Sequence, residues 1–385
     1  MGLKGTFSLS FWLMALQEFV SGNNLFTADV YSILKTSENL IVSPFAIQLV
    51  IAFAASGARN KTVQEMATAL HLPYHPRDTE TAWKTLLPTL IKPDHYHLNL
   101  LTKMYLHKNL NVKKEFRTNG KRIFQADTEL VNFANPADVA KSINEGVRKQ
   151  TGEKIQSLVD GNVLTRDTKV VLLSTAFFKS GWLKPFQFIE SQDFYKTAVE
   201  VIKVEMMEIT GQFNYFESDS IGAKLVELRF DDESLAMIVV LPDKVSSDIA
   251  LIEAHLYEVY LANSFTPQMV KVSLPKFKIE SLIDFKPILQ YLGMAKAFTS
   301  EAELDGIFQS KTEAFFDLVM QKCVINVDQR GLDMEPIRDL NEKTSINSIS
   351  VPTAQKFFTA DRPFMFFIRS KDLVIMTGKV VAPVT

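Results

Sequence analysis

The chain has 385 residues, of which 46% are hydrophobic and 22% are charged, so it can bury a large core and lacks the composition of a disordered protein. Its net charge of −2 gives no bulk attraction to DNA or RNA, and six histidines with one cysteine leave little material for a zinc cluster. We therefore expect no nucleic-acid partner and no metal site.

The first segment is typical of a secretory signal. Lys4 is the only charged residue before an apolar stretch from Phe7 to Leu16, and Val20-Ser21-Gly22 offers small residues spaced as at a signal-peptidase site. The sequence predicts a signal peptide over residues 1–22, a single mature domain over 23–385, and secretion to the extracellular space. The alternative is an amphipathic first helix of a cytosolic protein. A membrane anchor is disfavoured, because a span needs about 20 apolar residues and this run is shorter.

Helical signals dominate the first third of the chain. Ser43 can accept backbone hydrogen bonds as a helix cap, Pro44 suits the first turn, and the apolar run Ala46 to Ala55 ends before Gly57. A second helix is predicted to begin at the capping box Thr62-Val63-Gln64-Glu65.

Three smaller features bear on the environment of the protein. Asn60-Lys61-Thr62 is the only N-glycosylation sequon, so a glycoprotein is expected. Cys323 has no partner within the chain and is expected to be a buried small hydrophobe, so packing rather than disulfides holds the fold together. Lys113-Lys114 and Lys121-Arg122 form a modest basic cluster, which we interpret as a solvated helix face, with a weak polyanion site as the alternative.

Strand signals concentrate in the later part of the chain, which favours a mixed α+β fold without a linker that would divide it into two domains. Continuous apolar runs predict strands buried on both faces, and alternating runs predict half-buried ones. These runs are Val170–Leu173, Met237–Leu241, Val272–Leu274, Phe277–Ile279, Phe364–Ile368 and Leu373–Met376.

Motifs for catalysis are absent. The chain has no Gly-x-Ser-x-Gly elbow, no Walker loop and no Gly-x-Gly-x-x-Gly, so we expect no enzyme, no catalytic residue and no cofactor. His95-x-His97 is the only close histidine pair, and it is more typical of a surface loop than of metal ligands. Between Gly331 and Pro363 lies a long polar stretch with no apolar period, which is typical of a functional loop.

Ordered motifs along essentially the whole mature chain resemble those of the serpin family. They are Asn39–Pro44, Gly57–Thr62, Thr151–Ile155, Phe177–Trp182, Val239–Asp243, Leu274–Ile279, Ala360–Phe364 and Gly378–Val380. The resemblance implies helices packed around a large central β-sheet, further smaller sheets, an exposed reactive-centre loop and a monomer. The Ala-Asp-Arg-Pro-Phe form of one motif looks similar to arthropod members.

The resemblance also implies how the loop would work. In inhibitory members a serine protease cleaves the loop as a substrate, and the freed loop inserts as a central strand while the protease is still acyl-linked. Here the loop spans about residues 331–357. Family spacing places the scissile bond at Ser345-Ile346; Lys343-Thr344 is the alternative, and a trypsin-like protease would favour it. The implied partner is an extracellular serine protease.

The hinge of this loop departs from the family pattern of small residues. It reads Leu332-Asp333-Met334-Glu335-Pro336-Ile337-Arg338 after Gly331. In a strand, Leu332, Met334, Pro336 and Arg338 would share the face that the family pattern turns toward the core. Arg338 would then be a buried charge without an evident partner, and Pro336 would remove a ladder donor. A cost of about 3 kcal/mol would slow insertion roughly a hundredfold.

A polar cluster that accompanies sheet opening in the family is also altered. Ala46, Ser174 and Gln321 stand where inhibitory members carry a serine, an asparagine and a histidine, and we place Ser43 and Trp182 with them in one sheet-opening cluster. Three changes in one network suggest that the opening machinery was not kept. The alternative is a coordinated substitution in which Gln321 and Ser174 bond each other.

Two functions therefore remain. The favoured one is a secreted non-inhibitory serpin that acts as a binding, carrier or decoy protein, because its hinge is unsuited to strand insertion. The alternative is a suicide-substrate inhibitor of an extracellular serine protease, which the retention of Gly331, Trp182 and a long loop permits.

Overall fold

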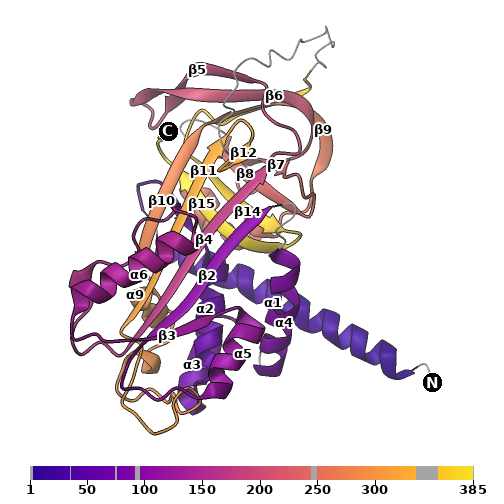
Figure 1. Ribbon diagram of the computed structural model, residues 1–385. Helices are drawn as coiled ribbons and strands as arrows, with labels where there is room; N and C mark the ends of the chain where they lie inside the picture. Colours follow the sequence, from indigo (N-terminus) through magenta and orange to yellow (C-terminus); the bar gives the residue numbers. More distant parts are fainter. Residues whose placement is uncertain are drawn as a thin grey trace.

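A computed structural model of the protein describes residues 3–34, 36–73, 76–91, 96–243, 249–334 and 354–384. Two β-sheets and their surrounding helices make up the molecule (Figure 1). The six-stranded sheet has the order β10-β11-β12-β4-β2-β3, and the nine-stranded sheet the order β1-β15-β14-β8-β7-β6-β9-β13 with β5 on β6. This arrangement confirms the mixed α+β fold.

The strands of the six-stranded sheet are β2 (His97–His107), β3 (Asp127–Val131), β4 (Val170–Gly181), β10 (Phe277–Asp284), β11 (Leu318–Asp328) and β12 (Gly331–Leu332). Those of the nine-stranded sheet are β1 (Leu40–Val42), β5 (Phe188–Tyr195), β6 (Val201–Ser218), β7 (Ala223–Arg229), β8 (Leu235–Pro242), β9 (Thr266–Pro275), β13 (Lys356–Thr359), β14 (Phe364–Ser370) and β15 (Leu373–Val380). The helices are α1 (Leu3–Ile33), α2 (Pro44–Ser56), α3 (Asn60–Ala69), α4 (Pro76–Leu90), α5 (Lys114–Phe124), α6 (Pro136–Gln150), α7 (Ala250–Ala254), α8 (Leu256–Tyr260) and α9 (Lys286–Tyr291).

The six-stranded sheet is covered on both faces, which explains the continuous apolar run in β4. Leu172 and Ala176 of β4 point into the main core, which also contains α2. Val171 and Leu173 alternate to the other face and pack in a second cluster with residues of α6. Figure 1 shows α6 lying across this face. The direction of every β4 side chain therefore follows from its even or odd number.

The start of α2 agrees with the sequence, but the start of α3 does not. Ser43 caps α2 by accepting from the backbone N–H of Ala46 at 3.2 Å, and Pro44 occupies the first turn. The capping-box prediction is wrong, because α3 already begins at Asn60. Thr62 Oγ1 accepts from the backbone of Glu303 at 3.0 Å, and Glu65 accepts from the backbone of Lys296 at 2.7 Å. Both side chains therefore bind the backbone of the segment that contains Lys296 and Glu303 instead of capping a helix.

The first helix continues through the predicted signal-cleavage site. The N-terminal end of α1 projects beyond the rest of the molecule (Figure 1), whereas Phe19 is fully buried and contacts Trp83 edge-on with 4.9 Å between ring centroids. Ser21 Oγ lies 2.9 Å from the Tyr257 hydroxyl. The predicted boundary at residue 22 therefore lies within a continuous helix, on the C-terminal side of the buried Phe19. Within the described residues, no helix is long and apolar enough to cross a membrane.

Two other sequence features have clear positions. Cys323 is a free thiol with 1% exposure, and burial raises its pKa to about 12, so it packs as a hydrophobe rather than reacting as a thiolate. Asn60 is exposed at the start of α3, where a glycan would project into solvent. Its side-chain amide donates to Glu303 at 3.1 Å.

Candidate functional site

The hinge of the long loop is already partly inside the six-stranded sheet. Gly331 and Leu332 form β12, which pairs antiparallel with β4 on one side and with β11 on the other. Beyond β12, β11 and β4 pair directly and in parallel, from Leu318 opposite Val171 to Val324 opposite Phe177. Leu332 is fully buried in the main core, so the first hinge residue with a side chain enters the sheet despite its size.

Gly331 is required by a close approach of two backbones. Its φ is +157°, and a Cβ atom at this position would lie 2.0 Å from the carbonyl oxygen of Ser180. Any other residue would push β12 away from β4, because the neighbouring atom belongs to the backbone and cannot rotate aside.

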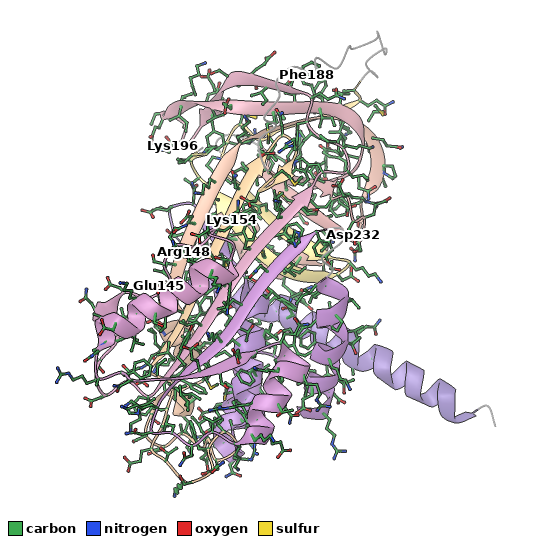
Figure 2. All side chains as sticks on the ribbon, viewed as in Figure 1. Glu145, Arg148, Lys154, Phe188, Lys196 and Asp232 are labelled. Atoms are coloured by element: carbon green, nitrogen blue, oxygen red, sulfur yellow. The ribbon has the colours of Figure 1, made fainter. Side chains whose placement is uncertain are left out.

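The inserted strand stops at Asp333. This residue has φ +51°, a left-handed conformation that an extended strand cannot contain. Its N–H still donates to the Asn326 carbonyl of β11 at 2.7 Å, and its carboxylate lies 2.6 Å from Lys154 Nζ. Figure 2 shows Lys154 just beyond the end of α6, over the strands of the six-stranded sheet. The ion pair ties the hinge to the segment that follows α6.

Trp182 fixes the end of the sheet where β12 enters. Its N–H donates to the Arg330 carbonyl at 2.8 Å and its indole Nε1–H to the Asp328 carbonyl at 3.0 Å. The ring is 2% exposed and stacks on Phe230 with 4.9 Å between centroids. Trp182 follows Ser174 by eight positions of extended chain, a span of about 26 Å. Its placement in one cluster with Ser174 is therefore wrong, because it holds the turn before the hinge.

Three residues of the predicted sheet-opening cluster do come together, around a clamp made by Gln321. The Ser43 N–H donates to Gln321 Oε1 at 3.0 Å, and Gln321 Nε2 donates to the Ser43 carbonyl at 2.8 Å. Ser43 Oγ donates to the Ile375 carbonyl at 2.7 Å and accepts from Ala46. Gln321 thus joins β11 to the start of α2, and Ser43 extends the connection to β15 within the buried core.

The clamp leads to a stability prediction. Replacing Gln321 with alanine leaves the buried N–H of Ser43 without its partner, while the Ser43 carbonyl keeps its bonds from the N–H groups of Ala46 and Ile47. We therefore expect Gln321→Ala to lower the free energy of unfolding by about 1–3 kcal/mol in urea titrations. Gln268→Ala is the control, because its amide bonds only the exposed Thr266 hydroxyl and its loss is expected to cost less than about 0.5 kcal/mol. Equal effects of the two substitutions would contradict the clamp.

Ser174 is not part of the clamp. It lies directly opposite Gln321 in the parallel β11–β4 pair, yet Gln321 bonds the Ser43 backbone and Ser174 Oγ has no hydrogen-bond partner. The expected bond between Gln321 and Ser174 is therefore absent. On its other side Ser174 is opposite Thr102 of β2, whose Oγ1 is also buried without a partner. We call Gln321, Ser174 and Thr102 the polar row.

Most of the remaining predicted site residues fall outside the described part of the chain. The exception is the hinge residue Met334, which is half-buried. Glu335, Pro336 and Arg338 lie outside the described residues, as do both pairs considered for the scissile bond, Lys343-Thr344 and Ser345-Ile346. The loop rejoins the described chain before β13, which pairs in parallel with β9 of the nine-stranded sheet.

A cavity of about 290 Å³ opens beside Trp182. Burial raises the pKa of Glu227 in its wall, but hydrogen bonds from Arg229, Asn214 and Arg369 outweigh burial and hold that pKa below its ordinary value. The carboxylate is therefore charged and already paired. The lining residues are Trp182, Leu183, Lys184, Phe186, Gln212, Phe213, Asn214, Glu227, Leu228, Arg229 and Pro267. Among the described residues, no group of three or more His, Cys, Asp or Glu side chains is placed to hold a metal ion.

Sequence reasoning missed Asp333, Lys154 and Thr102 as functional positions. Lys154 was noted only as part of a family motif, and its partner is far away in the chain, so no local pattern links the two. Thr102 becomes visible only when the register of β2 on β4 is known.

Comparisons with known proteins agree with this fold. A family profile described as Serpin (serine protease inhibitor) matches residues 21–383. Serpin48 of the insect Tenebrio molitor, described as a highly specific serpin, superposes with a TM-score of 0.87 at 34% identity over 95% of this chain and 98% of its own.

Two sequence relatives cover nearly the whole chain. An uncharacterized serpin-like protein of Thermococcus kodakarensis is 31% identical over 94% of this chain and 85% of its own length. Serine protease inhibitor 42Dd of Drosophila melanogaster is 29% identical over 92% of this chain and 95% of its own. With the partly inserted hinge and the two sheets, these matches establish that the chain belongs to the serpin family.

Proposed function

We propose that this protein is a secreted, non-inhibitory serpin whose loop is cut as an ordinary substrate and which serves as a binding, carrier or decoy protein. The proposal depends on one observation, the register of β12. Leu332 pairs with Ser180 in an antiparallel register. If β12 were extended by four residues in the same register, Pro336 would pair with Ala176 of β4.

The hydrogen-bond directions of β12 make this register costly for proline. The Arg330 carbonyl accepts from the Trp182 N–H on the β4 side, and the Asp333 N–H donates to β11 on the other side. The backbone N–H and C=O groups of even-numbered hinge residues are therefore directed toward β4, and those of odd-numbered residues toward β11. Position 336 should therefore donate its N–H to the Ala176 carbonyl, and proline has no N–H to give. An unpaired buried carbonyl costs about 1–3 kcal/mol, and this cost would raise the barrier to insertion and slow it. The acyl-enzyme would then have time to hydrolyse before the strand is inserted.

The test is a panel of trypsin-, chymotrypsin- and elastase-type serine proteases. After incubation with each, denaturing gels should show the protein shortened by cleavage in the loop and no complex whose mass is the sum of protease and serpin. The second candidate, a suicide-substrate inhibitor cut near Ser345-Ile346 or Lys343-Thr344, is favoured by the insertion of Gly331 and Leu332 in the uncut chain. A complex that survives denaturation with any of these proteases would establish it and overturn our proposal.

Secretion is the second part of the proposal. The apolar run that follows Lys4 supports it, and because Phe19 is fully buried, we propose that cleavage falls before that residue rather than near Gly22. The exposed Asn60 sequon is consistent with passage through the secretory pathway. For a carrier role, the cavity beside Trp182 is the candidate location.

A further inference from the structure

The cavity beside Trp182 has walls that neighbouring strands hold in place. Gln212, Phe213 and Asn214 belong to β6, and Leu228 belongs to β7, which pairs with β6 in an antiparallel register. Trp182 follows directly after the last residue of β4. Because sheet hydrogen bonds fix these walls, a ligand would not have to order them on binding. The volume of about 290 Å³ is close to the lower limit of small-molecule pockets, about 300 Å³, so the cavity suits a small ligand.

Aromatic rings form much of the apolar part of this cavity. Trp182, Phe186 and Phe213 line it, and all three are buried. Trp182 and Phe186 meet edge-on, with 6.2 Å between ring centroids. Leu228 adds a buried aliphatic side chain. Rings that packing holds in place offer edge-to-face and stacking contacts to a further ring, so the apolar part of the cavity suits a flat aromatic group.

One cation at the cavity has no acidic partner. Lys184 Nζ donates to the Gln212 carbonyl at 2.7 Å and lies 5.3 Å from the centroid of the Phe213 ring, so the ammonium group lies against two residues that line the cavity. This bond uses one of its three hydrogens. In the described chain Lys184 makes no ion pair with a carboxylate. Its charge and two of its donors are therefore available to a ligand.

The carboxylate in the cavity wall is already neutralised. Glu227 accepts from Arg229 Nε at 2.9 Å and from Arg369 Nη2 at 3.1 Å. Arg229 Nη1 also donates to Glu233 at 3.2 Å. Two arginines thus balance two glutamates, and the charge of Lys184 is left unbalanced. An anionic group on a ligand would balance it, whereas a cationic ligand would meet a like charge.

We propose that this cavity binds a small aromatic carboxylate, whose ring lies against Trp182, Phe186 and Phe213 and whose carboxylate accepts a hydrogen bond from Lys184 Nζ. A bond between an ammonium group and a carboxylate is charge-assisted and roughly twice as strong as a neutral hydrogen bond. Lys184 is then the residue that selects an acid over a neutral molecule of the same shape. The inference rests on the carrier role within the proposed function and names the class of molecule that is carried.

The test uses the intact protein and two probes of the same shape, naphthoate and its neutral analogue naphthamide, with affinities measured by calorimetric titration. We expect naphthoate to bind about tenfold more tightly, because only the acid gains the charge-assisted bond. Lys184→Met removes the charge and keeps a long side chain. It should weaken naphthoate binding about tenfold and leave the affinity for naphthamide unchanged. Lys184→Arg keeps the charge and should retain most of the naphthoate affinity.

Lys203→Met is the matched control. Lys203 is also an exposed lysine and belongs to β6, but it pairs with Asp193 at 2.8 Å and does not line the cavity. Its substitution should change neither affinity. Equal affinities of the natural protein for the acid and the amide would overturn the proposal, as would naphthoate binding that Lys184→Met leaves unchanged. The absence of binding of either probe at millimolar concentration would overturn it too.

This titration and the protease panel fail independently. A trapped protease complex would overturn the non-inhibitory function and leave the measured affinities as they are. Failure of naphthoate to bind would overturn the ligand assignment, but it would not change the outcome of the panel, because that assay contains no ligand and scores only covalent complexes.

Discussion

A mature chain that starts at Leu16 is expected to be about 3–5 kcal/mol more stable to urea unfolding than one that starts at Asn23. The longer chain keeps Phe19, which is fully buried against Trp83, and keeps the contact between Ser21 and Tyr257. The shorter chain leaves an aromatic-sized hole in the main core.

The substitution Phe19→Ala in the longer chain is the matched control, because it removes the ring and keeps the rest of α1. It should reproduce most of the loss. If the chains that start at Leu16 and Asn23 unfold at the same urea concentration, Phe19 contributes nothing and cleavage near Gly22 is again the better prediction. Mass analysis of the protein recovered from the culture medium of cells that express it would locate the natural start directly.

The substitution Pro336→Ala is expected to raise the rate of loop insertion after cleavage by roughly tenfold to a hundredfold. Alanine supplies the N–H that the Ala176 carbonyl requires in the register set by Leu332 and Ser180. Because insertion competes with hydrolysis of the acyl-enzyme, the variant should form a denaturation-resistant complex with at least one protease that only cuts the natural chain. The fraction of protease recovered as complex is the measurement.

Pro352→Ala provides the control for the previous substitution. This proline belongs to the same loop but follows both candidate scissile bonds, so it is outside the segment that cleavage would free to insert. The Pro352→Ala variant should give the same fraction of protease in complex as the natural chain. Identical complex yields for Pro336→Ala and the natural chain would show that proline is not what limits insertion.

Local chemistry allowed much of the fold to be predicted. Ser43 and Pro44 begin α2 as expected, and the apolar run at Val170 lies in a strand buried on both faces. The capping box failed because Thr62 and Glu65 bind residues near position 300, and a tertiary contact of this kind leaves no mark on neighbouring residues. The same reason hides the ion pair of Lys154 with Asp333.

The site was predictable in its residues but less so in its geometry. Ser43, Ala46 and Gln321 were identified and do meet. Ser174 and Trp182 lie far apart, because Ser174 is inside β4 and Trp182 follows its last residue. The bonds within the cluster depend on how the strands and α2 are placed. Gln321 lies opposite Ser174 in the β11–β4 pair, but its amide bonds the backbone of Ser43, and Ser174 Oγ has no hydrogen-bond partner.

The parallel contact between β11 and β4 makes this junction the least favourable one in the centre of the sheet. Parallel pairs are slightly less stable per residue than antiparallel ones, and both outer neighbours, β10 and β2, pair with these strands in the antiparallel sense. A strand that continues β12 runs opposite to both, so it exchanges one parallel ladder for two antiparallel ones. Each residue added to β12 would therefore replace parallel pairing between β11 and β4 with antiparallel pairing on both sides, while β2 and β3 stay parallel at the edge of the sheet.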